Sequence, residues 1–346
     1  MYKVGIIGYF AIGKSKAGGQ EAKTCSLDRA MKEAYGPNKV LNIDTTNWKK
    51  HPLKLLFQLL TICFRCQNII ILPAQNSIRI FVPILTVINH FFHRRLIYSV
   101  VGGWLPEFLE EHQSLQKQVR RLDAILVETK SMKDHLRKLK INNVEVVPNF
   151  KFLNPVDLEE LNLEAESPYK VCTFSRVMEE KGIEDAIETV KNVNKKYGKT
   201  EVVLHIYGKI DDGYREHFAK IRKEFPDYIE YKGMVEPDES IAVVKNYSAL
   251  LFPTHYYTEG VPGTIIDAYM SGVPIITALW GNYQDVFEEN ITGWGYTFGN
   301  QKEFQKCLEH LVTNPEEFFK MKKSVLEYSS KFIPEYAMEI IAQYIE

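Results

Sequence analysis

The stretch Leu250–Thr277 constrains the fold of this chain more than any other part of the sequence. It opens with a continuous apolar run, which is typical of a buried parallel strand. A loop punctuated by glycine and proline follows, and Thr264–Met270 then has apolar residues at helical spacing. Gly272 and Pro274 end this helix before a second apolar run begins. This order of strand, loop, helix and strand predicts a parallel α/β sheet.

The same stretch predicts a ligand site where its first strand ends. Glu259 follows that strand, at the carboxyl edge of the sheet, where ligands bind in open α/β folds. Gly260, Gly263 and Thr264 offer backbone N–H groups at a helix N-terminus, which attracts anions. Asp267 lies about one turn into the helix. Two acids beside an anion site suit a nucleotide sugar, although a plain sheet crossover with a solvated acid would have the same pattern.

The segment EGVPGTIIDAYMSGVPII resembles the signature EGFG-x-x-x-x-E-A-x-A-x-G-x-P-V-I of glycosyltransferase family 4. Members of that family are retaining enzymes with the GT-B fold. The resemblance implies that Glu259 contacts the donor sugar. It assigns the ribose contact to Asp267, which replaces the usual glutamate and is one methylene shorter. It also implies that the loop and the helix start bind the donor through Gly260, Val261, Pro262, Gly263 and Thr264.

A second motif, Ser175–Gly182, resembles the family pattern G-R-x-x-x-x-K-G, with a serine in place of the first glycine. The resemblance places Arg176 and Lys181 at the donor pyrophosphate, where two cations would stabilise the charge that develops as it leaves. Surface salt bridges to neighbouring glutamates are the alternative. The predicted catalytic residues are therefore Glu259, Arg176 and Lys181. Because the cations and helix dipoles offset the phosphate charge, no metal and no other cofactor is expected.

The segment after the first strand has two interpretations. Gly18, Gly19 and Glu21 resemble the family motif GG-x-E, in which glycine N–H groups approach the donor phosphates. Gly8–Ser15 instead matches the phosphate-loop pattern GxxxxGK[ST] of ATPases and kinases. Asp44 is then the one candidate for a magnesium partner. The two adjacent glycines interrupt the helix that a phosphate loop needs, which weighs against that interpretation.

Alternating strands and helices predict an α/β protein with doubly wound parallel sheets. With the resemblance, this becomes the GT-B architecture, in which two Rossmann-like domains face a cleft. The expected division is a first domain at 1–150 that the final helix at 332–346 rejoins, a linker at 151–168 and a donor domain at 169–331. In the first domain, helices are expected near 19–35, 52–66, 77–93, 104–120 and 130–140.

The family resemblance is incomplete in one respect. Many members carry a histidine near the reacting sugar, whereas the matching segment Tyr98–Trp104 has none. Gly102 and Gly103 would let backbone approach the substrate there, and no general base is assigned. A non-catalytic sugar-nucleotide-binding protein and a nucleotide-sugar epimerase of the same fold therefore stay open beside the transferase.

Charge is distributed unevenly along the chain. Residues 1–150 contain 22 Lys+Arg and 11 Asp+Glu, and no acid occurs between Asp44 and Glu107. This pattern favours a glycan or lipid-linked acceptor and an anionic membrane surface, with a basic solvated face as the alternative. It fits polysaccharide or lipopolysaccharide assembly, and no nucleic-acid motif is present. Cys63 and Cys66 are expected to be reduced core residues.

No signal peptide is recognised, because Lys3–Gly8 forms a strand directly. The chain is therefore expected to be cytoplasmic, and a peripheral position on the inner face of the membrane stays open.

Overall fold

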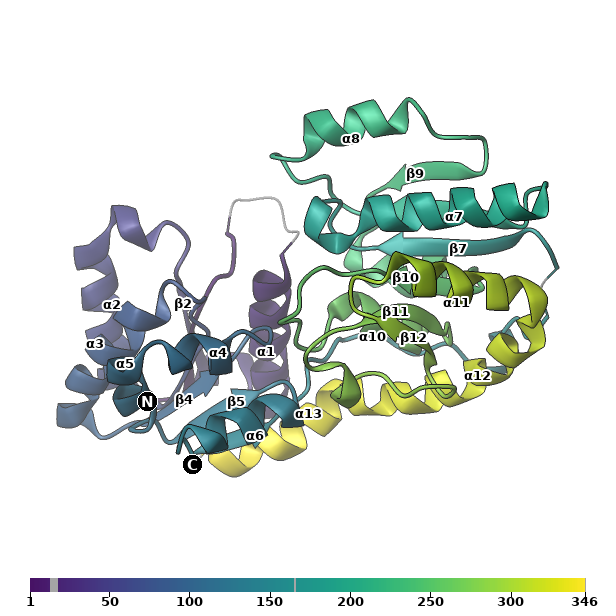
Figure 1. Ribbon diagram of the computed structural model, residues 1–346. Helices are drawn as coiled ribbons and strands as arrows, with labels where there is room; N and C mark the ends of the chain where they lie inside the picture. The colour runs from purple at the N-terminus through teal and green to yellow at the C-terminus, as the bar shows by residue number, and fades with distance from the viewer. Residues whose placement is uncertain (13–17, 165, 346) are drawn as a thin grey trace. The chain divides into compact units, whose positions relative to one another are not determined.

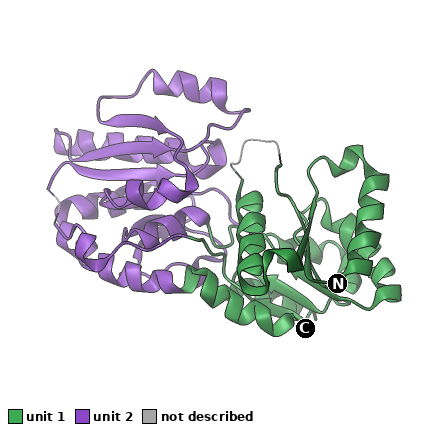
Figure 2. Ribbon diagram, turned by 180° about the vertical axis from the view of Figure 1, so that it is seen from behind, with its two compact units in different colours: residues 1–152, 259–262, 331–346 green, residues 153–258, 263–330 purple. Residues whose placement is uncertain are grey.

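The computed structural model describes residues 1–12, 18–164 and 166–345. They divide into two compact units, coloured separately in Figure 2. Unit 1 comprises residues 1–152, 259–262 and 331–346, and unit 2 comprises residues 153–258 and 263–330. The four residues 259–262 lie in the sequence range expected for the second domain, yet they group with unit 1.

Unit 1 is built on a six-stranded parallel sheet with the order β2-β1-β3-β4-β5-β6. Its strands are β1 (Tyr2–Gly8), β2 (Val40–Asp44), β3 (Cys66–Ile71), β4 (Arg95–Ser99), β5 (Ala124–Val127) and β6 (Val144–Val146). In the central register, Ile6 pairs with Asn42 on one side and with Ile70 on the other. The central strands are almost fully buried, because helices cover both faces of the sheet.

Two apolar clusters fill the space between this sheet and its helices (Figure 1). One cluster lies under α2 (Pro52–Arg65), α3 (Ile78–Phe92), α4 (Leu105–Glu110), α5 (Gln113–Val119) and α6 (Lys130–Lys138). The other lies under α1 (Gly19–Tyr35) and α13 (Pro334–Ile341). Ala337 and Ile341 of α13 are buried in the same apolar cluster as Val4 and Ile6 of β1, so a late segment of the chain completes the core of unit 1.

Unit 2 contains a second six-stranded parallel sheet, ordered β12-β11-β10-β7-β8-β9. Its strands are β7 (Tyr169–Phe174), β8 (Val202–Tyr207), β9 (Ile229–Gly233), β10 (Ala249–Phe252), β11 (Ile275–Leu279) and β12 (Gly293–Thr297). Its helices are α7 (Ile183–Tyr197), α8 (Arg215–Arg222), α9 (Ser240–Val244), α10 (Gly263–Met270), α11 (Gln301–Thr313) and α12 (Pro315–Tyr328). The two parallel sheets confirm the predicted fold class.

Two predicted elements are wrong in detail. The single helix expected at 104–120 is two helices, because Leu109 and Leu115 both point into the core and a continuous helix would turn one of them away. His112, between them, has non-helical backbone angles.

Cys66 begins β3 instead of ending a helix. Burial raises the pKa of the Cys63 thiol to about 11 and that of Cys66 to about 12, as expected for unreactive core residues.

Among the described residues, no helix is both long enough and apolar enough to cross a membrane.

Candidate functional site

The ends of β7 and β10 bring two of the predicted motifs together in unit 2. These strands are parallel neighbours, with Val171 opposite Ala249 and Cys172 opposite Leu250. The segments that follow them therefore leave the same edge of the sheet. This carboxyl edge is where ligands bind in open α/β folds.

Lys181 lies against the segment that follows β10. It ends a one-turn 3₁₀ helix, Glu179–Lys181, and its Nζ is 4.9 Å from the centre of the Tyr256 ring. The same atom is 5.7 Å from the centre of the Phe252 ring. A cation over aromatic faces is held by the quadrupoles of the rings. The amino group that sequence analysis assigned to a pyrophosphate is thus positioned by the strand that leads to Glu259.

The backbone fixes this juxtaposition further. Gly182 has a φ of +64°, and a Cβ there would lie 1.8 Å from the carbonyl oxygen of Pro253, so only glycine fits. The His255 N–H donates to the carbonyl oxygen of Glu180 at 2.8 Å. The His255 Nε2 atom also lies 2.8 Å from a carboxylate oxygen of Asp185 in α7.

Arg176 faces the turn after β8. Its guanidinium is 3.7 Å from the Asp211 carboxylate, and its side chain is 43% exposed. An exposed ion pair at this distance contributes little to stability. The guanidinium therefore keeps most of its capacity to bind an anion. The alternative interpretation for this residue was a salt bridge to a neighbouring glutamate, and the ion pair in the structure is with Asp211 instead.

The N-terminus of α10 carries an unsatisfied polar atom. The hydroxyl oxygen of Thr264 is buried and has no hydrogen-bond partner among the described residues. Leaving such a group unpaired costs about 1–3 kcal/mol, a cost that a bound water or a ligand at this helix N-terminus would remove. Gly263 and Thr264 are the first two residues of this helix.

The two predicted acids have different environments. Asp267 is 2% exposed, and its carboxylate accepts a hydrogen bond of 2.9 Å from the Ser240 hydroxyl of α9. Glu259 is half-buried and belongs to the segment 259–262 of unit 1. A ribose contact by Asp267 stays a prediction, as does a sugar contact by Glu259.

Sequence analysis missed a buried ionic cluster in unit 1. The Glu128 carboxylate is 2.6 Å from Lys23 Nζ, and both side chains are buried. It also accepts N–H groups from Gly102 at 3.1 Å and from Val261 at 2.8 Å. Gly260 has no room for a side chain, because its Cβ would lie 2.1 Å from a Glu128 oxygen.

This cluster binds the segment 259–262 to the core of unit 1. A sequence signal for it existed, since Glu128 is the one charged residue that ends the apolar run of β5.

The family model for glycosyl transferases group 1 matches residues 157–330, just over half of the chain. The chain belongs to this family. The narrower assignment to family 4 stays a prediction.

Solved structures support the GT-B fold of this glycosyltransferase. HepE from Anabaena, solved in complex with UDP, has a TM-score of 0.77 at 14% identity, with 99% of both chains covered. Sucrose-phosphate synthase from Thermosynechococcus elongatus has a TM-score of 0.78 at 16% identity, covering 99% of this chain and 98% of the other. At these identities the likeness shows the fold alone.

One curated relative is similar in sequence over part of the chain. The amylovoran biosynthesis glycosyltransferase AmsK of Erwinia amylovora is 21% identical over 147 residues. The match covers 40% of the glycosyltransferase described here and 36% of AmsK, so the chain spans about a third of that relative's length.

The predicted anion site at the start of α1 is open. Gly18 precedes the helix with extended backbone angles, and at both Gly18 and Gly19 the position that a Cβ would take has no other atom within 4 Å among the described residues. Their contact with donor phosphates stays a prediction.

The competing interpretation of this region is a phosphate loop. In that pattern, Gly13–Ser15 lies outside the described residues. The Asp44 carboxylate accepts N–H groups from Phe10 and Thr46, so it joins the segment after β1 to the turn after β2.

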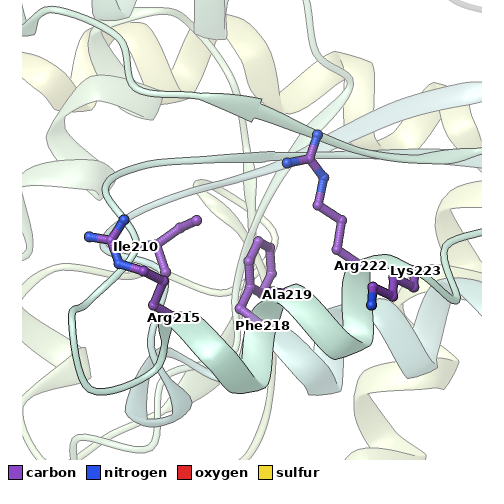
Figure 3. Close-up of a pocket in the computed structure, with 6 residues that line it drawn as sticks. All are labelled: Ile210, Arg215, Phe218, Ala219, Arg222 and Lys223. Carbon is purple, nitrogen blue, oxygen red and sulfur yellow. The ribbon is translucent and has the colours of Figure 1, made fainter.

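A further pocket of about 410 Å³ lies on α8, and none of the residues that line it is a predicted site residue (Figure 3). It is lined by Ile210, Arg215, Phe218, Ala219, Arg222 and Lys223. Arg215 pairs with Asp212, and Arg222 stacks on the Tyr231 ring. These partners account for both guanidinium groups, so we assign the pocket no role.

Proposed function

We propose that the glycosyltransferase is a retaining enzyme that moves a sugar from a nucleoside-diphosphate sugar to a glycan or lipid-linked acceptor. The observation that carries the donor class is the position of Lys181 beside the loop after β10. The unpartnered hydroxyl of Thr264 at the start of α10, unpaired among the described residues, adds to it. HepE was solved with UDP and with UDP-glucose, which supports the same class.

The chemistry follows from the charge of the leaving group. As the bond to the sugar breaks, negative charge grows on the diphosphate. Arg176, Lys181 and the N-terminal N–H groups of α10 would stabilise that charge most in the transition state. We therefore propose that transfer needs no metal, with Glu259 orienting the sugar and Asp267 the ribose. The name of AmsK supports a place in cell-surface polysaccharide or lipopolysaccharide biosynthesis.

The first experiment is a thermal-shift panel of UDP, GDP, ADP, ATP and their sugars, each in EDTA and in magnesium. We expect one nucleoside diphosphate and its sugar to raise the melting temperature in EDTA. Lys181→Ala should weaken that binding about tenfold, which corresponds to about 1.4 kcal/mol. Lys195→Ala, an exposed lysine at the far end of α7, is the matched control and should bind normally.

Glu259→Gln should keep nucleotide binding and lose sugar transfer, and NMR of the product should show a retained anomeric configuration. An inverted product would contradict the retaining mechanism. Conversion of the donor to its epimer without acceptor would favour an epimerase. Binding of the nucleotide sugar without any turnover would favour a non-catalytic protein. ATP binding that requires magnesium and is lost in Lys14→Ala would favour the phosphate loop instead.

A further inference from the structure

Helix α2 has apolar residues on two separate faces. One face packs into the core of unit 1 through Leu55, Leu59, Ile62 and Cys63. The other is exposed and consists of Leu53, Leu56, Phe57, Leu60 and Phe64. Their spacing of three, one, three and four residues places them in a single stripe along the helix. A helix that packs on a sheet needs one apolar face, so the fold of unit 1 does not explain the second.

The exposed stripe continues onto α3. The two helices lie side by side in unit 1 (Figure 1), and the Phe64 ring is 6.4 Å from the Phe92 ring of α3. Next to Phe92, Phe91 is 76% exposed, and Val87, one turn earlier, is 66% exposed. We call Leu53, Leu56, Phe57, Leu60, Phe64, Val87 and Phe91 the α2–α3 surface. Contiguous exposed apolar surface of this kind marks an interaction site.

The charged residues directly before α2 and in its first turn are all lysines. Lys49 and Lys50 lie exposed on the 3₁₀ helix Trp48–Lys50, directly before α2, and Lys54 is exposed in its first turn. The sequence from Asp44 to Glu107 supplies no acid to balance them. Exposed phenylalanine and leucine flanked by lysine match the chemistry of an anionic bilayer, whose acyl chains accept the apolar groups and whose headgroups attract the cations.

A second copy of the chain fits this surface less well. A two-fold interface would bring the lysines of both copies together without acids from this segment to pair with them. The charge therefore favours a lipid surface over self-association.

We propose that the α2–α3 surface docks the protein on an anionic membrane, with Leu53, Phe57 and Phe64 inserted at the boundary between headgroups and acyl chains. This inference does not depend on the proposed transfer activity. The proposal assigns membrane contact to α2 and α3, whereas the sequence pattern related it only to the positive charge of residues 1–150.

The test is co-sedimentation of the full chain with vesicles of about three parts phosphatidylcholine to one part phosphatidylglycerol, at low salt. We expect binding to these vesicles and not to pure phosphatidylcholine. Two sets of changes should each lower the partition coefficient about tenfold or more. They are the pair Phe57→Ser and Phe64→Ser, and the triple set Lys49→Gln, Lys50→Gln and Lys54→Gln.

Matched controls come from exposed residues of unit 2. They are the pair Leu158→Ser and Met234→Ser, and the triple set Lys195→Gln, Lys220→Gln and Lys223→Gln. Both should bind vesicles within about twofold of wild type. Unchanged melting temperatures show that each variant is folded.

The proposal is overturned if wild type ignores the anionic vesicles, if the phenylalanine pair binds like wild type, or if the controls lose binding equally. It is also overturned if the vesicle-free protein is a dimer that Phe57→Ser and Phe64→Ser dissociate.

Discussion

Glu128 shows how one buried side chain can fix the geometry of a distant segment. Its carboxylate binds Lys23 and accepts N–H groups from the turn after β4 and from Val261. A buried charge with several partners is stable only while all of them remain, because each partner compensates the loss of hydration. Removing one member should therefore cost more than its pairwise attraction alone.

We expect Glu128→Ala to lower the free energy of unfolding by about 3–5 kcal/mol, since it leaves the Lys23 ammonium buried without its counter-charge. Lys23→Met alone should also destabilise. The double variant should lose less than the sum of the two, with a coupling energy of about 2 kcal/mol or more. Urea unfolding of wild type, the two single variants and the double variant measures this coupling energy. Strictly additive losses of stability would contradict an energetic coupling between Lys23 and Glu128.

At the scale of residues, sequence predicted types of chemistry better than contacts. Lys181 was assigned from its place in a motif, and the structure shows it beside Tyr256. The burial of Asp267 against Ser240 was not foreseeable, because the two residues belong to separate elements whose packing depends on the whole sheet. The Glu128 cluster joins four segments far apart in the chain, which no local pattern encodes.

Single elements also contain charges that reduce stability, and α12 is an example. Lys322 is 3% exposed, and burial lowers its pKa from 10.5 to about 8. Its Nζ lies 5.4 Å from the centre of the Phe319 ring. Because burial disfavours the ammonium form, the helix carries a protonated lysine at neutral pH at a cost in stability.

Lys322→Met should therefore stabilise the protein at pH 7 by roughly 3 kcal/mol. Between about pH 8 and pH 10.5 the unfolded chain still binds the proton that the folded chain has released, so wild-type stability rises with pH across this window. The advantage of the variant should shrink accordingly. Urea unfolding at several pH values measures it, with the exposed Lys320→Met as control. If the difference in unfolding free energy between Lys322→Met and wild type does not change with pH, the lowered pKa of Lys322 is contradicted.

Elements with strong periodicity and clear end signals were predictable from sequence. The helix expected at 19–35 is found at Gly19–Tyr35. The break between α4 and α5 was not predictable from the sequence, because it depends on which leucines the sheet buries. Tertiary packing decided there against the local helical pattern.

At the scale of the whole molecule, the alternation of strands and helices was sufficient to predict two parallel sheets. The membership of residues 259–262 in unit 1 could not be predicted from this alternation. It rests on the long-range hydrogen bond from the Val261 N–H to the Glu128 carboxylate. The final helix was expected to rejoin the first domain, and Ala337 and Ile341 are its residues that reach the core of unit 1.

Ile341→Ala should destabilise unit 1 by about 2–4 kcal/mol, because it opens a cavity in the apolar cluster that α1 and α13 cover. Ile340→Ala makes the same chemical change at a half-buried position of the same helix and should cost clearly less. Urea unfolding of wild type and both variants measures the two losses of stability. Equal losses in the two variants would show that α13 contributes through its length and not through its packing.

The return of α13 to unit 1 also sets an order of assembly during synthesis. Translation runs through the whole of unit 2 before residues 334–341 leave the ribosome, and only then can they join the apolar cluster that α1 also covers. Unit 2 has all its strands by that time and can close first. In a nascent chain, the part of the first sheet that α13 covers therefore stays exposed until late in translation.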